Sequence, residues 1–212
     1  MERKLIVTAV ALLCLIIAIP TISALATVGA KPKILVNITV PLKSVAGEGT
    51  SEQRGDNIMF KDACWTATPT GVTLKIYKWL PNTSPPPEYV PAPSSGEEPW
   101  PLTNKYTGGT CLAEAHGTRD AYTFSGKWHM QFKVTFNING VESGFEFRHD
   151  CTAVGLVHSA TWDGQGFGAF DGLKVSGISI ADLTKAPATK LMWGEVTGGW
   201  DNIPAANVLP LS

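Results

Sequence analysis

The chain has 212 residues, of which 44% are hydrophobic and 17% are charged, and its formal net charge is −1. This length favours one domain, and the seven Trp and eight Phe residues supply enough apolar surface for a core, which argues against global disorder. A net charge near zero gives no electrostatic reason to expect a nucleic-acid partner. We therefore expect a folded protein with a polar but sparsely charged surface.

The first 26 residues have the pattern of a secretory signal peptide. A short charged start precedes an apolar run over residues 5–19, and Ala24 and Ala26 supply the small residues that signal peptidase requires. The apolar run is shorter than the roughly 20 residues that span a bilayer. We predict a signal peptide over residues 1–26 that is cleaved, leaving a secreted protein of the cell surface with no membrane span; an uncleaved anchor is the alternative.

Export allows disulfide formation and glycosylation. Three cysteines follow the predicted cleavage site, Cys64, Cys111 and Cys151, so we expect one disulfide and one remaining thiol, with the three pairings left open. Sequons at Asn37 and Asn82 predict glycan attachment if the host modifies exported proteins.

The segment 27–42 contains an unusually regular strand. Over residues 33–42 apolar and polar positions alternate with the period of two that is typical of a strand. One face carries Ile34, Val36, Ile38, Val40 and Leu42. This strand is either the first strand of the chain's own sheet or a donor strand that inserts into a neighbouring subunit.

The most specific local prediction is a hairpin around Asn139-Gly140. The runs 128–138 and 141–151 alternate on either side of this dipeptide, which is the preferred sequence of a two-residue type I′ turn. Such a turn places Ile138 opposite Val141 and fixes every later pair. In that register one face of the hairpin is mostly apolar, and the other face places opposite charges across from each other.

The remaining segments favour an all-β fold with no long amphipathic helix. Residues 72–79 and 173–180 read as strands, and the proline-rich stretch 81–101 reads as a surface loop, or alternatively as a linker between domains. The spacing of strands and turns predicts a single β-sandwich or jelly-roll domain over residues 43–212.

Aromatic side chains near the C-terminus suggest one binding surface. Trp162, Phe167 and Phe170 lie among glycines, and exposed rings on a β-sandwich could stack on sugar rings; burial in the core is the alternative. The aromatic-Asp-Gly sequences at 162–164 and 170–172 predict two turns.

No catalytic motif stands out. Glu142, Glu146 and Asp150 share one strand face, but neighbours four residues apart lie about 13 Å from one another, which is too far for a pair of glycosidase carboxyls. His129 opposite Asp150 suits a surface polar pair. The histidines have no metal-ligand spacing, so we predict no metal and no cofactor.

These observations favour a structural role over an enzymatic one. We predict an exported subunit of an extracellular filament, such as a pilus, or of a surface layer, which self-associates by strand donation through the apolar face of residues 34–42. The alternatives are a secreted carbohydrate-binding module and a secreted hydrolase whose site is assembled from distant loops.

Overall fold

The computed structural model describes residues 33–44, 49–67, 71–79, 100–185 and 188–199. The predicted signal peptide, Asn82 and almost all of the proline-rich stretch lie outside these ranges. The described residues form antiparallel strands and one short 3-10 helix, so the all-β prediction is confirmed. The elements are β1 (Lys33–Pro41), β2 (Lys43–Ser44), β3 (Thr50–Arg54), β4 (Asn57–Thr66), β5 (Val72–Trp79), β6 (Leu102–Asp120), β7 (Gly126–Ile138), β8 (Val141–Val154), β9 (Val157–Phe167), η2 (Gly168–Phe170), β10 (Lys174–Asp182) and β11 (Thr189–Gly198).

The strands follow an up-and-down order from β6 onward, whereas the first five strands are not all paired in chain order. β1 pairs with β5, while β2 and β3 pair with opposite ends of β4. β4 and β5 in turn both pair with β6, which is 19 residues long. From β6 to β11 each strand pairs with the next one in the chain.

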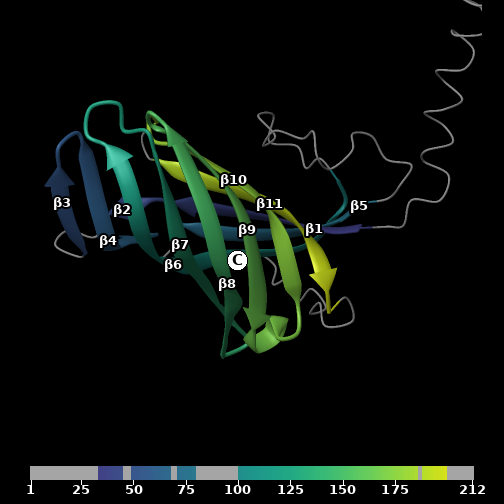
Figure 1. The fold of residues 1–212 in the computed structure, drawn as a ribbon. Coiled ribbons are helices and arrows are strands. Elements are labelled where there is room, and N and C mark those ends of the chain that lie inside the picture. Colours follow the sequence, from purple (N-terminus) through teal and green to yellow (C-terminus); the bar gives the residue numbers. More distant parts are fainter. Residues whose placement is uncertain (1–32, 45–48, 68–70, 80–99, 186–187, 200–212) are drawn as a thin grey trace, which may run out of the picture.

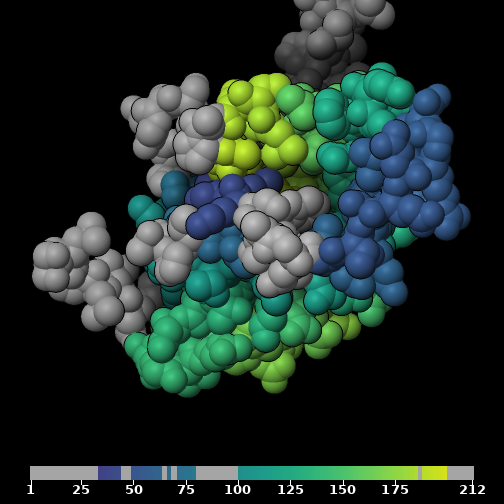
Figure 2. Space-filling model, turned by 90° about the vertical axis from the view of Figure 1, so that its left-hand side faces the viewer, coloured from purple at the N-terminus to yellow at the C-terminus, as the bar shows by residue number. Residues whose placement is uncertain are grey.

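The first and last strands close the sheet. β1 pairs with β11 from Leu35↔Glu195 to Pro41↔Thr189, and Figure 2 shows the purple residues of β1 beside the yellow residues of β11. The result is a closed eight-stranded antiparallel barrel of β1 and β5–β11, beside which β3 and β4 and the two-residue β2 extend the sheet; its curved wall is visible in Figure 1. The predicted sandwich or jelly roll is therefore wrong, because one continuous sheet surrounds the core where a sandwich would pack two sheets face to face.

The hairpin prediction is confirmed in full. Asn139 and Gly140 have φ angles of 53° and 83°, as a type I′ turn requires. β7 and β8 keep one register from Ile138↔Val141 to Gly126↔Ala153. The apolar face of the hairpin lies inside the barrel, because alternate residues of each strand point to opposite faces of the wall.

Large rings fill one end of the barrel, which we call the aromatic end. Phe145 stacks on Phe170 with ring centroids 4.9 Å apart, and Trp162 meets Phe147 edge-on at 5.2 Å. All four side chains are buried. The turns at 139–140 and 168–173 lie at this end, so the rings close the barrel here.

One predicted turn is wrong for an instructive reason. Residues 162–164 lie within β9. A Cβ on Gly164 would come within 2.3 Å of the Phe147 ring, so glycine at this position makes room for an aromatic side chain from the neighbouring strand. The turn predicted at 170–172 is confirmed, because the Leu173 N–H donates to the Phe170 carbonyl just before β10 begins.

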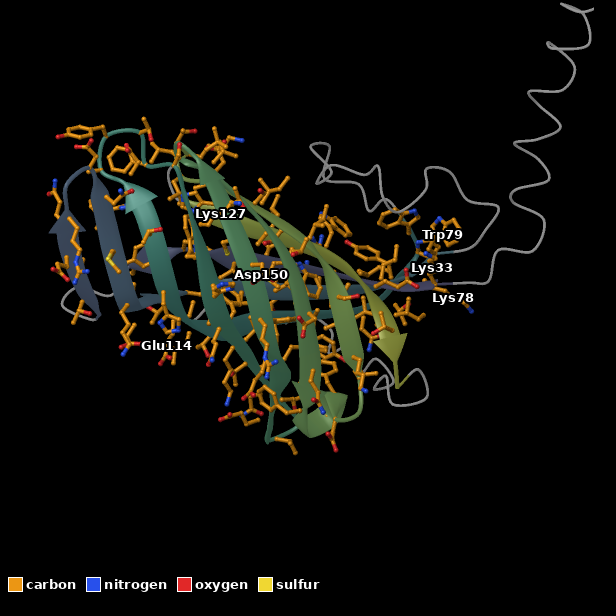
Figure 3. The ribbon with its side chains drawn as sticks, viewed as in Figure 1. Lys33, Lys78, Trp79, Glu114, Lys127 and Asp150 are labelled. Carbon is orange, nitrogen blue, oxygen red and sulfur yellow. The ribbon has the colours of Figure 1, made fainter. Side chains whose placement is uncertain are left out.

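A second aromatic cluster covers part of the outer wall. Trp100 and Trp193 meet edge-on at 5.7 Å, and the cluster also buries Leu35, Tyr77 and Trp79. Figure 3 shows Trp79 near Lys33, at the end where β1 begins and β5 ends. β1 is therefore covered on both faces. This explains why Leu35 and Asn37, which lie on the face opposite Val36 and Ile38, are also buried.

Candidate functional site: a buried lysine in an apolar cavity

Small side chains leave a cavity at the end of the barrel opposite the aromatic rings, which we call the cavity end. Here β7, β9 and β11 begin and β8 and β10 end. The cavity has a volume of about 230 Å³. Its apolar wall comes from Leu42, Trp128, Met130, Phe132, Ala160, Ala181, Leu183 and Ala188, and its polar groups come from Cys151, His158, Ser159, Ser179 and Lys190.

Lys190 is the one ammonium-bearing side chain on this wall. It is only 5% exposed, and it points inward because it lies on the same face of β11 as the buried Met192 and Val196. Its Nζ lies 4.0 Å from the sulfur of Met130 and 5.2 Å from the centroid of the Phe132 ring. Within the part of the chain that the structure describes, no carboxylate forms an ion pair with Lys190.

An isolated buried charge is costly, so burial lowers the pKa of Lys190 below its ordinary value of 10.5. A thioether and a ring face are weak partners for an ammonium, and neither offsets the loss of water. The empty cavity therefore favours the neutral amine.

Burial has the opposite consequence for the two interior thiols. Cys111 and Cys151 are buried free cysteines. Loss of water disfavours the thiolate, so the pKa of each thiol is raised. The structure thus shows no bridge between these two; the side chain of Cys64, the third candidate for the predicted disulfide, lies outside the described part.

Several polar side chains inside the barrel have atoms without a hydrogen-bond partner among the described residues. They include the indole nitrogens of Trp128 and Trp162, the Ser179 hydroxyl, on the cavity wall, and both ring nitrogens of His149, deeper in the barrel. Ser179 and His149 are at most 2% exposed. Buried polar groups are normally paired, so an unpartnered hydroxyl on a cavity wall indicates a place for a ligand or for water.

His149 should make the protein sensitive to acid. Burial is the main reason that its pKa is lowered from 6.5 to about 2, and Lys190 adds to this effect whenever it is protonated. The folded state therefore keeps His149 neutral while the unfolded state binds a proton below pH 6.5, so stability is lost as the pH falls. We expect His149→Leu to remove a slope of about 1.4 kcal/mol per pH unit between pH 6.5 and 4.5, measured as the free energy of unfolding in urea. The exposed His129→Gln is the control; an unchanged slope in His149→Leu would show that the ring is already solvated.

The residues predicted to form a donor strand lie in the chain's own barrel. Val36, Ile38 and Val40 are buried in the core, and Ile34 and Leu42 pack against it. The adjacent Asn37 is 6% exposed, and its Nδ2 donates to the Met192 carbonyl at 3.2 Å, so this sequon amide is occupied inside the fold.

The predicted sugar-stacking residues do not form an exposed platform. Trp162 and Phe170 are 4% and 0% exposed and face the core. Phe167 is half-buried beneath the Lys133 ammonium, which lies 4.7 Å from the ring centroid.

The charged face of the β7–β8 hairpin lies on the outside of the barrel. His129 Nδ1 and Asp150 Oδ1 are 2.6 Å apart, and both side chains are more than 70% exposed. Lys133 lies 3.5 Å from Glu142 and 3.7 Å from Glu146. Figure 3 marks Asp150 and, on β6, Glu114, both of which point away from the core.

Lys190 was missed from the sequence, although a signal was present. In residues 190–196, alternate side chains point to opposite faces of the strand, and each of the two faces contains large apolar side chains. The pattern therefore does not tell which of these two faces points to the core, and a lysine is ordinarily assigned to the solvent-exposed face. Only the pairing of β11 with both β1 and β10 decides it.

None of the helices among the described residues is long and apolar enough to cross a membrane. No protein-family model matches the chain, and no curated protein or solved structure matches it significantly.

Proposed function

We propose that the barrel binds a small, mainly apolar molecule in its interior, with the polar group of that molecule beside Lys190. One observation carries this proposal: the apolar cavity contains a buried lysine that forms no ion pair with any carboxylate of the described residues. Closed eight-stranded barrels have an interior just wide enough to be filled by side chains or to hold one small ligand. Here the side chains fill the aromatic end and leave the cavity end empty.

The cavity sets the size of the ligand. A cavity of about 150 Å³ holds benzene, so one of 230 Å³ has room for roughly nine non-hydrogen atoms. This is the size of a medium-length alkyl chain with one polar end group.

The filament and carbohydrate hypotheses concern contacts that a single chain does not contain, and they stay predictions. β1 is hydrogen-bonded along both edges within its own chain, by β5 and by β11. A donated strand would first have to leave these partners. The interior cavity needs no such rearrangement, and for this reason we prefer ligand binding.

A series of linear alcohols tests the proposal without requiring a known ligand. Each CH₂ group that is buried contributes about 0.8 kcal/mol, so calorimetry with 1-pentanol to 1-decanol should show binding that tightens about fourfold per carbon. The gain should level off near octanol, when the cavity is full. Undetectable binding across the series would overturn the proposal.

Two substitutions on neighbouring residues of β9 provide a matched control. Ala160 lines the cavity, whereas Thr161 points outward and is exposed. Ala160→Phe should fill the cavity and weaken octanol binding at least tenfold, while Thr161→Phe should leave it unchanged. Circular dichroism verifies that both variants fold, and equal octanol affinity in two folded variants would place the binding site elsewhere.

A further inference from the structure

We infer that the ligand is an aldehyde, which the Lys190 amine captures reversibly as an imine. This inference rests on the proposed function, since the aldehyde must first enter the cavity. It concerns the chemical class of the ligand, which cavity size alone does not define.

The surroundings of Lys190 leave its amine free to react. Nζ lies 4.0 Å from the Met130 sulfur and 5.2 Å from the centroid of the Phe132 ring, and neither group is a strong hydrogen-bond acceptor. Four titratable groups influence or neighbour this amine from three strands: Cys111 on β6, Cys151 and His149 on β8, and His158 on β9. All four favour their neutral forms, because burial raises the pKa of both thiols and lowers the pKa of both imidazoles.

The same burial makes the amine the strongest nucleophile inside the barrel. A thiol reacts through its charged thiolate, which burial disfavours, so Cys111 and Cys151 become less reactive. An amine reacts in its neutral form, which burial favours, so Lys190 becomes more reactive. A desolvated lysine in an apolar pocket is the usual setting for imine formation.

Desolvation also favours an aldehyde over a carboxylate. A carboxylate would lose its water and meet a single ammonium, and the Coulombic gain of such a pair often fails to repay the loss of hydration. An aldehyde enters the cavity uncharged. Its oxygen can accept a hydrogen bond from the Ser179 hydroxyl, which has no partner in the barrel.

The reaction balances without an oxidant or a reductant. The Nζ lone pair attacks the carbonyl carbon, a C–N bond forms, and the C=O π electrons move to oxygen, which takes a proton that nitrogen loses. The C–O bond of this carbinolamine then breaks, nitrogen loses its second proton, and a C=N bond forms as one water leaves. Ser179 is a positioning residue here, since it would hold the oxygen that departs.

Reductive trapping with octanal tests the inference in the full-length protein. Octanal and sodium cyanoborohydride are added at pH 7, and peptide mapping locates the alkylated lysines. An ordinary exposed lysine is neutral in only about one molecule per thousand at this pH, so Lys190 should be labelled at least tenfold faster than any other lysine. Octanol should slow the labelling of Lys190 alone.

Lys190→Met should lose this fast phase, while Lys127→Met, a change on the exposed face of β7, should retain it. Labelling that spreads over the surface lysines and spares Lys190 would overturn the imine. If octanol binds while Lys190 stays unlabelled, the proposed function survives and only the aldehyde is wrong; if octanol does not bind, the proposed function has failed by its own test.

Discussion

Replacement of Lys190 by methionine should stabilise the protein at neutral pH by about 1–4 kcal/mol, because it removes a buried ionisable group that has no ionic partner in the described part of the chain. Methionine has a similar length and no branch, so it can follow the path of the lysine stem between Met130 and Phe132. Stabilisation combined with the loss of a function is the usual signature of a residue that is kept for chemistry.

The pH dependence of this gain identifies its cause. Lys190 has a lowered pKa in the folded state, so between that pKa and the unfolded value of about 10.5 the unfolded chain binds one more proton than the folded one. The stability of the wild type therefore rises with pH through this window, by up to about 1.4 kcal/mol per pH unit. The advantage of Lys190→Met should shrink accordingly. At pH 7 the protonation component cannot exceed about 5 kcal/mol.

Urea unfolding of both proteins at pH 7, 8 and 9 measures the effect. The thiols of Cys111 and Cys151 also titrate in this range in the unfolded chain, but they are present in both proteins and largely cancel in the difference. Lys127→Met should change stability by less than about 0.5 kcal/mol at every pH. A Lys190→Met advantage that stays constant with pH, or a loss of stability, would mean that Lys190 is a solvated ammonium.

The features that were predicted correctly are those that depend on neighbours in the chain. Asn139-Gly140 fixes the turn, the turn fixes the register, and the register agrees with two independent patterns, one apolar and one charged. β5 was also placed at its observed bounds, 72–79, because its period-two pattern is bounded by a glycine and by the proline-rich stretch.

The barrel could not be deduced from the same kind of pattern. Alternating strands with short turns build either a sandwich or a barrel, and the difference lies in whether β1 meets β11. These strands are more than 140 residues apart in the chain. Leu35 and Asn37, on the outward face of β1, are buried because the barrel closes and because the outer aromatic cluster covers this face. Neither the closure nor the cluster has a local sequence signal.

The candidate site is one step further from the sequence, because it requires both closure and a count of side-chain volumes around the barrel. The wall of the cavity carries Ala160 on β9 and Ala181 on β10. Each alanine is unremarkable in its own strand. Only the closure of the wall brings them together around one cavity beside Lys190.

Phe145→Ala should cost about 3–5 kcal/mol, the range for truncation of a fully buried Phe. Phe145 is 0% exposed, and it stacks on both Phe170 and Phe147, with centroids 4.9 and 5.8 Å away. Removal of the ring leaves a void that the rigid barrel wall cannot close. The measurement is the free energy of unfolding in urea, with Val141→Ala, at an exposed position of the same strand, as the control.

The same kind of truncation at the cavity end should be much less costly. Leu183 is half-buried and lines the existing cavity, so Leu183→Ala enlarges a space that is already present, and we expect a loss of about 1 kcal/mol. Equal losses at Phe145 and Leu183 would mean that the two ends are packed alike, and the cavity beside Lys190 would then have no basis. A large difference between them follows directly from a barrel that is filled with rings at one end and contains a cavity at the other.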